Sequence, residues 1–82
     1  MYYFHSDPGH AWLAVKRAEL IKLGILNQIS SCSYQKGGTV YLEEDCDAGV
    51  FIEAKQKIGE PVVPKETYQE NTPIRNYPCF NA

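Results

Sequence analysis

YYFHSDPGHAWLAV, residues 2–15, sets the architecture of this chain. The aromatic run at 2–5 is typical of a β-strand, and residues 10–15 predict a second strand. Between them, Pro8 presets φ at the first central position of a tight turn, and Gly9 can take a positive φ at the next position. The stretch therefore predicts an antiparallel β-hairpin at the start of the fold.

The residues after this hairpin change to the apolar spacing of a helix. That spacing predicts a helix over 16–23, and Gly24 stands where a left-handed glycine ends such a helix. Two more strands are predicted at 29–35 and 39–43, because a glycine-rich tight turn at 36–38 separates them. The chain therefore contains a second predicted β-hairpin.

A second helix is predicted after the second hairpin. Asp45 or Asp47 can accept the free N–H groups of its first turn, and Gly59 ends it. The element order is strand–strand–helix, twice. We therefore predict an α+β fold with a small four-stranded antiparallel sheet. It is built from two β-hairpin–helix units (ββαββα), with the helices on one face and an extended C-terminal tail.

The composition changes after residue 59. Four prolines are spread among polar residues in the last part of the chain, and prolines exclude a long helix and disfavour a central strand. We therefore predict a ββαββα domain over 1–59. Residues 60–82 form an extended, proline-containing tail that packs on the domain or on a partner.

Composition and charge exclude several classes of protein. The chain has 82 residues, 44% of them hydrophobic and 22% charged, which are globular values. A net charge of −2 argues against nucleic acid as the partner. No apolar run approaches the roughly 20 residues of a membrane span. Three widely spaced cysteines without a C-x-x-C pair predict reduced thiols in the cytoplasm, and no cofactor is predicted.

The predicted strands carry large apolar side chains on both faces of the sheet, because side chains alternate along a strand. Two helices cover only one face. Either the tail folds back over the second face, or that face binds a protein partner or a second copy of the chain. The residues expected at such an interface are Tyr3, Trp12, Tyr34, Tyr41, Ile74, Tyr77 and Phe80.

The tip of the first hairpin suggests a different function. His5 and His10 flank the turn, so they are expected to face one another as a cross-strand pair, with Asp7 between them. Two imidazoles and a carboxylate can bind Zn²⁺ or act in acid–base catalysis. The alternative interpretation is that all three are polar hairpin residues.

Carboxylates are densest over 43–47, where they suit a helix N-terminus. They also disfavour a thiolate at Cys46, so a nucleophilic role is not predicted for that residue.

Four segments together resemble a group of small uncharacterised proteins found in bacteriophages, prophages and plasmids. The segments are HSDPGHAWL (5–13), SYQ (33–35), YLEEDCD (41–47) and IRNY (74–77), and the similarity covers most of the chain. The resemblance implies a mobile-element accessory protein in a bacterial cytoplasm, and proteins of that origin often bind and block a host factor, including defence systems. The surplus aromatic surface and the lack of a convincing catalytic set predict that the chain acts by non-catalytic binding to a protein partner. The resemblance itself implies no catalytic residue.

Overall fold

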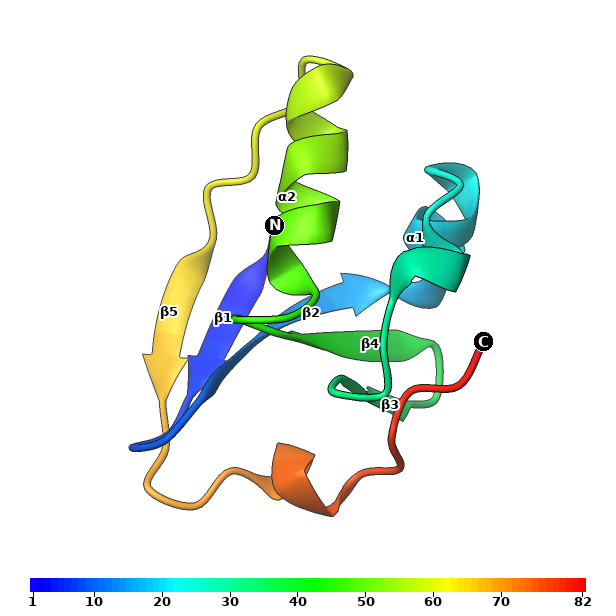
Figure 1. Ribbon diagram of the computed structural model, residues 1–82. Coiled ribbons are helices and arrows are strands. Elements are labelled where there is room, and N and C mark those ends of the chain that lie inside the picture. Colours follow the sequence, from blue (N-terminus) through cyan, green and yellow to red (C-terminus); the bar gives the residue numbers. More distant parts are fainter.

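The predicted first hairpin is present in the computed structural model, which describes residues 1–82 (Figure 1). Strand β1 (Tyr3–Ser6) pairs antiparallel with β2 (Ala11–Lys16). The turn between them is held by the Asp7 carboxylate, which accepts the N–H groups of Gly9 and His10 at 2.9 Å each. Gly9 does not adopt a positive φ, so that expectation was wrong.

The segment between the two hairpins is helical but shorter than predicted. Helix α1 (Arg17–Lys22) ends as expected at Gly24, which has φ +72°. A 3₁₀ turn, η1 (Leu26–Gln28), follows. Strand β3 covers only Tyr34–Lys36, because the residues before it form a loop that is hydrogen-bonded to the start of the second helix.

The second β-hairpin pairs β3 with β4 (Thr39–Glu43) and leads into helix α2 (Ala48–Lys57). Asp47 occupies the N-cap position, but its side chain does not bond to the helix. The Asp47 carboxylate instead binds serines of the preceding loop. The predicted end of the helix at Gly59 is confirmed by its φ of +74°.

The α+β class is confirmed, whereas the four-stranded antiparallel sheet was incomplete. The sheet has five strands in the order β3-β4-β2-β1-β5 and is mixed. The additional strand, β5 (Lys65–Tyr68), pairs parallel to β1 at the sheet edge. Residues 60–82 therefore add a strand to the sheet as well as an extended segment.

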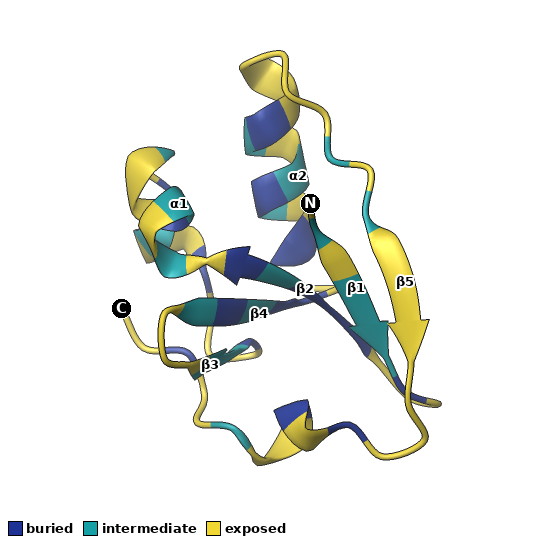
Figure 2. Cartoon of the chain, turned by 180° about the vertical axis from the view of Figure 1, so that it is seen from behind, coloured by how far each residue is buried: buried dark blue, intermediate teal, exposed yellow.

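Both helices lie on one face of the sheet, where they enclose the main core (Figure 2). Phe51 of α2, Leu20 of α1 and the inward residues of β2 and β4 are fully or almost fully buried. Neither helix has the length and hydrophobicity needed to cross a bilayer. The buried apolar cluster contains Leu13, Val15, Leu20, Ile25, Ile29, Val40, Leu42, Ala48, Phe51 and Phe80.

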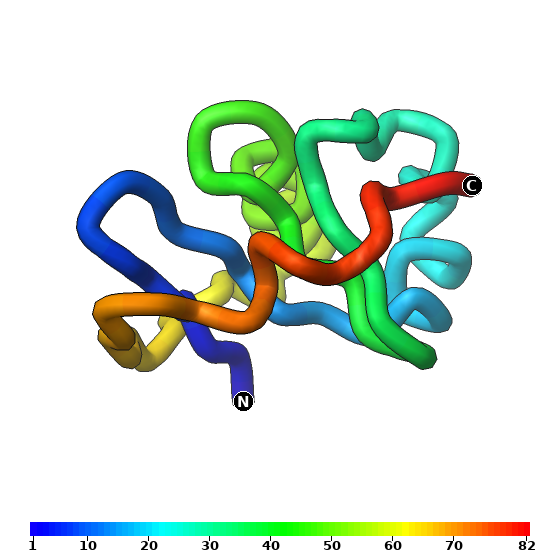
Figure 3. Tube along the Cα trace, turned by 90° about the horizontal axis from the view of Figure 1, so that it is seen from below, coloured from blue at the N-terminus to red at the C-terminus, as the bar shows by residue number.

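The C-terminal segment 69–82 crosses the other face of the sheet (Figure 3). It contains the 3₁₀ turn η2 (Pro73–Asn76), which contributes the buried Ile74. It then reaches β3, where Tyr34 forms a bridge with Cys79. Phe80 donates its N–H to the Ser33 carbonyl at 2.8 Å and joins the core on the helix side. The tail therefore covers part of the second face within the same chain.

Candidate functional site

Part of the second sheet face remains accessible beside the tail, and aromatic rings occupy it. Tyr3, His5, Tyr41 and Tyr77, here called the aromatic row, follow one another across the sheet. The ring centroids are separated by 6.1 Å for Tyr3 and His5, 6.2 Å for His5 and Tyr41, and 5.3 Å for Tyr41 and Tyr77. Tyr3 is 40% exposed, and the other three rings are half-buried.

Three lysines belong to the same side of the sheet by strand register. Lys65 stands opposite Tyr3, while Lys16 and Lys36 both stand opposite Thr39. The Lys36 ammonium lies 4.8 Å from the centroid of the Tyr77 ring. No carboxylate forms a salt bridge with any of the three, although the chain carries a net charge of −2. The aromatic row therefore has an uncompensated positive border.

Burial sets the protonation of two members of the row. It lowers the pKa of His5 from its ordinary value, which favours a neutral ring at neutral pH, and His5 Nδ1 lies 2.9 Å from Thr67 Oγ1. Burial, together with the neighbouring Tyr77 hydroxyl, raises the pKa of Tyr41. His5 and Tyr41 therefore present neutral rings on this face.

The residues expected at an interface separate into two groups. Tyr3, Tyr41 and Tyr77 lie together in the aromatic row. Trp12 and Ile74 are only 2% and 4% exposed, so contacts within the chain cover them. The other two also lie outside the row: Phe80 is in the core, and Tyr34 packs against Trp12.

The residues expected to bind a metal are held apart by the hairpin register. His5 stands opposite Trp12, so the expected cross-strand pairing of His5 with His10 was wrong. His10 Nδ1 instead lies 3.4 Å from the Glu43 carboxylate. The chain contains no cluster of three or more histidine, cysteine, aspartate or glutamate side chains arranged to hold a metal ion.

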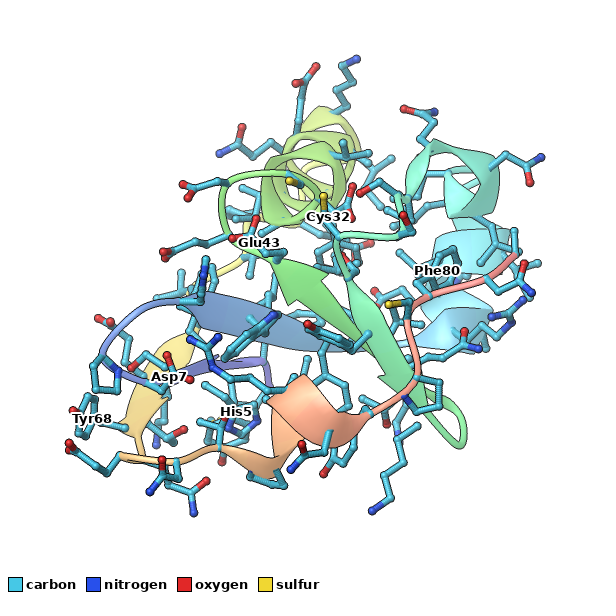
Figure 4. The ribbon with its side chains drawn as sticks, turned by 60° about the horizontal axis from the view of Figure 1, so that its bottom comes forward. His5, Asp7, Cys32, Glu43, Tyr68 and Phe80 are labelled. Atoms are coloured by element: carbon cyan, nitrogen blue, oxygen red, sulfur yellow. The ribbon has the colours of Figure 1, made fainter.

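The third of these residues, Asp7, ties the hairpin to the tail (Figure 4). Its carboxylate accepts two hydrogen bonds from Arg75, from Nε at 2.5 Å and from Nη2 at 2.9 Å. A Cβ at Gly9 would lie 3.0 Å from Arg75 Nη2, so glycine permits the guanidinium to approach. The pair links residues 68 positions apart in the sequence.

The Asp7 tether is expected to make folding sensitive to acid. The Arg75 guanidinium holds the pKa of Asp7 well below its ordinary range. A carboxyl group whose pKa is lowered by folding stabilises the fold above its unfolded-state pKa of about 3.9 and loses that contribution as the pH falls further. We expect Asp7→Asn to lower the urea midpoint near neutral pH, with a difference from the wild type that shrinks below about pH 4.

The measurement is a series of urea unfolding curves from neutral to acidic pH. Asp45→Asn is the matched control, because the Asp45 side chain is exposed and accepts no hydrogen bond. A difference between Asp7→Asn and wild type that stays constant across the range would contradict the tether.

A cleft of about 390 Å³ opens beside Trp12, and no residue of the aromatic row lines it. Glu43 lies in it and accepts the N–H groups of Asp45 and Cys46 at 2.8 and 2.9 Å. Burial acts to raise the pKa of Glu43, but these hydrogen bonds and one from the Cys46 thiol outweigh it and lower the pKa. Sequence reasoning missed this cleft, which is lined by His10, Trp12, Cys32, Tyr34, Glu43, Asp45, Cys46 and Arg75.

Comparisons with protein-family models, with curated proteins and with solved structures find no match for this chain. The resemblance to phage, prophage and plasmid proteins therefore stays a prediction.

Proposed function

We propose that this chain is a non-catalytic binding protein whose aromatic row engages an acidic segment of a protein partner. One observation carries the proposal: neutral aromatic rings and three lysines without carboxylate partners share the accessible part of the second sheet face. The row holds three of the seven residues expected at an interface.

The tyrosines supply the apolar part of this surface. A tyrosine ring offers a large contact area, loses little conformational entropy on binding, and carries a hydroxyl for a polar contact. Tyrosine is also enriched among the few interface residues whose truncation costs about 2 kcal/mol or more. Tyr3 is the most exposed ring of the row and is therefore the expected anchor.

The lysines determine the chemistry of the partner. Lys16 and Lys36 are both exposed, as is Lys65, and charge complementarity favours acidic side chains opposite them. The remainder of the chain is net acidic, which opposes the approach of a long polyanion. A short acidic protein segment fits this distribution better than nucleic acid does.

The proposal extends to the setting that the sequence resemblance implies. In a bacterium that carries a phage, prophage or plasmid, the partner would be a host or defence factor in the cytoplasm. Inhibition by occupation of an acidic site requires no catalytic residue on this chain.

A homo-oligomer is the second candidate, and the outer edge of β5 favours it. All four residues of β5 are exposed, and Tyr68 there is 61% exposed. An edge strand offers unpaired backbone groups to a second copy of the chain. A mass above 9.3 kDa in light scattering would support this candidate if it is lost in Glu66→Pro, because the N–H groups of Lys65 and Gln69 bond inward to β1 and that of Glu66 therefore faces the free edge.

Charge reversal at the border of the row tests the main proposal. We expect Lys16→Glu combined with Lys36→Glu and Lys65→Glu to weaken binding of a captured bacterial protein at least tenfold, which corresponds to about 1.4 kcal/mol. Tyr3→Ala should weaken it similarly. The partner is first isolated from nuclease-treated lysate and identified, and its affinity is then measured with both purified proteins.

The control reverses charge on the helices, with Lys22→Glu and Lys57→Glu, and should leave the affinity unchanged; it is compared with the pair Lys16→Glu and Lys36→Glu, which changes the net charge by the same amount. An equal loss of affinity in the sheet-face variant and in the helix variant would mean a general electrostatic effect, and it would contradict the assignment of binding to the aromatic row. A different outcome is tight, salt-dependent binding of a single-stranded oligothymidylate. If the lysine variants on the sheet face lose this binding and the helix variant keeps it, the partner is nucleic acid.

A further inference from the structure

Two cysteines from different loops meet at the cleft beside Trp12. Cys32 lies in the loop between η1 and β3, and Cys46 lies in the turn between β4 and α2. Both line the same cleft and both are exposed, so a small molecule can reach either sulfur. Figure 4 shows Cys32 close to Glu43, which accepts the backbone N–H of Cys46 at 2.9 Å.

A buried carboxylate fixes the two cysteine-bearing segments together. Asp47, next to Cys46, accepts hydrogen bonds from the Ser30 N–H at 3.1 Å and the Ser30 hydroxyl at 2.9 Å. It also accepts one from the Ser33 hydroxyl at 2.5 Å. Ser30 and Ser33 stand on either side of Cys32, so the loop that carries this cysteine is held against the start of α2.

The surroundings of Cys46 disfavour its ionisation. A hydrogen bond with the Cys32 thiol and a second with the Glu43 carboxylate raise the pKa of Cys46 to about 12. Cys46 therefore retains its proton near neutral pH, and a thiolate is the attacking species in disulfide exchange. These contacts assign the first attack to Cys32 and the second step to Cys46.

We propose that Cys32 and Cys46 form a reversible dithiol–disulfide pair whose substrate is a low-molecular-weight disulfide. The Cys32 thiolate attacks one sulfur of that disulfide, breaks its S–S bond and releases one small thiolate. Cys46 then attacks the Cys32 sulfur of the mixed disulfide and breaks its S–S bond, and the Cys46 proton passes to the departing small thiolate. The second small thiol leaves, so the protein dithiol is oxidised and one small disulfide is reduced to two thiols.

The third cysteine provides an internal reference. Cys79 is exposed but lies outside the cleft, on the tail segment that bridges to Tyr34. It should react with a small disulfide without finding a resolving thiol. The proposal is independent of partner binding by the aromatic row, because no residue of the row lines the cleft.

The experiment equilibrates the reduced full chain with mixtures of reduced and oxidised glutathione, then quenches with an alkylating reagent and maps peptides by mass spectrometry. We expect one linkage, Cys32 to Cys46, with the mass lowered by two hydrogen atoms. Cys79→Ser should give the same linkage. Cys46→Ser should instead accumulate a glutathione adduct at Cys32.

The same reaction in concentrated urea supplies the reference for an unstructured chain. There the three possible pairings should form as a mixture, whereas the folded chain should strongly favour one. The same mixture in folded and unfolded chains would overturn the proposal. Independent glutathione adducts at Cys32 and Cys46, with no linkage between them, would overturn it as well.

Discussion

A chain that ends at residue 59 is expected to lose cooperative folding. Truncation removes β5 and also exposes the sheet face that holds Trp12. Burial of Ile74 and Phe80 contributes about 1.5–3 kcal/mol each, and uncovering Trp12 costs a comparable amount. Domains of this size rarely have more than about 3–5 kcal/mol from a single core, so the loss exceeds what the remaining fold can absorb.

Urea unfolding followed by circular dichroism measures this effect. The matched control ends at residue 80, because it keeps Phe80 and loses only the backbone contacts of Asn81 and Ala82 with Arg17 and Gln35. We expect this control to unfold cooperatively, close to the full chain. A cooperative transition in the chain of residues 1–59, at the midpoint of the full chain, would instead support an autonomous domain with a dispensable tail.

Trp12→Ala is expected to cost about 3–5 kcal/mol, the usual range for truncating a buried aromatic residue. Trp12 is 2% exposed and packs between Tyr34, at a centroid distance of 6.2 Å, and the Arg75 guanidinium, at 5.4 Å. Its removal would leave a cavity between the sheet and the tail, and the Tyr34 ring and the Arg75 guanidinium would lose their contact with it.

Trp12→Phe is the informative comparison. The indole Nε1 is buried without a hydrogen-bond partner, so replacing it with phenylalanine removes an unsatisfied donor while keeping an aromatic ring. We expect Trp12→Phe to cost much less than Trp12→Ala in urea or thermal unfolding. A cost for Trp12→Ala below about 1 kcal/mol, as at an exposed position, would contradict the burial of this side chain.

Local patterns predicted the elements with strong short-range determinants. Pro8 and the flanking strands identified the first hairpin, and helix periodicity together with Gly24 and Gly59 identified both helix ends. These features depend on neighbours within a few residues. The α+β class followed from them because each hairpin leads directly into a helix.

The fifth strand had no comparable pattern. Residues 65–68 read KETY, all four are exposed, and Pro64 precedes them. Parallel pairing with β1 depends on backbone groups about 60 positions away, which alternation within the segment does not reveal. The Asp7–Arg75 pair is equally long-range, and only the folded course of the tail identifies it.

The candidate sites were predicted to different extents. Strand alternation predicted that aromatic side chains would occupy the second face. It could not predict that Trp12 and Ile74 are buried, because their burial depends on the path of the tail across that face. The lysine border could have been found from the alternation of Lys16 and Lys36 with their strand neighbours. The cysteine pair could not have been found in this way. Cys32 and Cys46 are brought together because Asp47 binds the loop that carries Cys32, whereas the sequence pattern around Asp47 is that of an ordinary helix cap.

The most direct test of the account uses the only tryptophan of the chain. Acrylamide quenching of Trp12 fluorescence, measured over a dilution series, reports whether the tail covers this side chain within one molecule. We expect weak quenching and a blue-shifted emission that do not change with protein concentration. Quenching as strong as that of free tryptophan, or protection that disappears on dilution, would contradict the placement of the tail across the second sheet face.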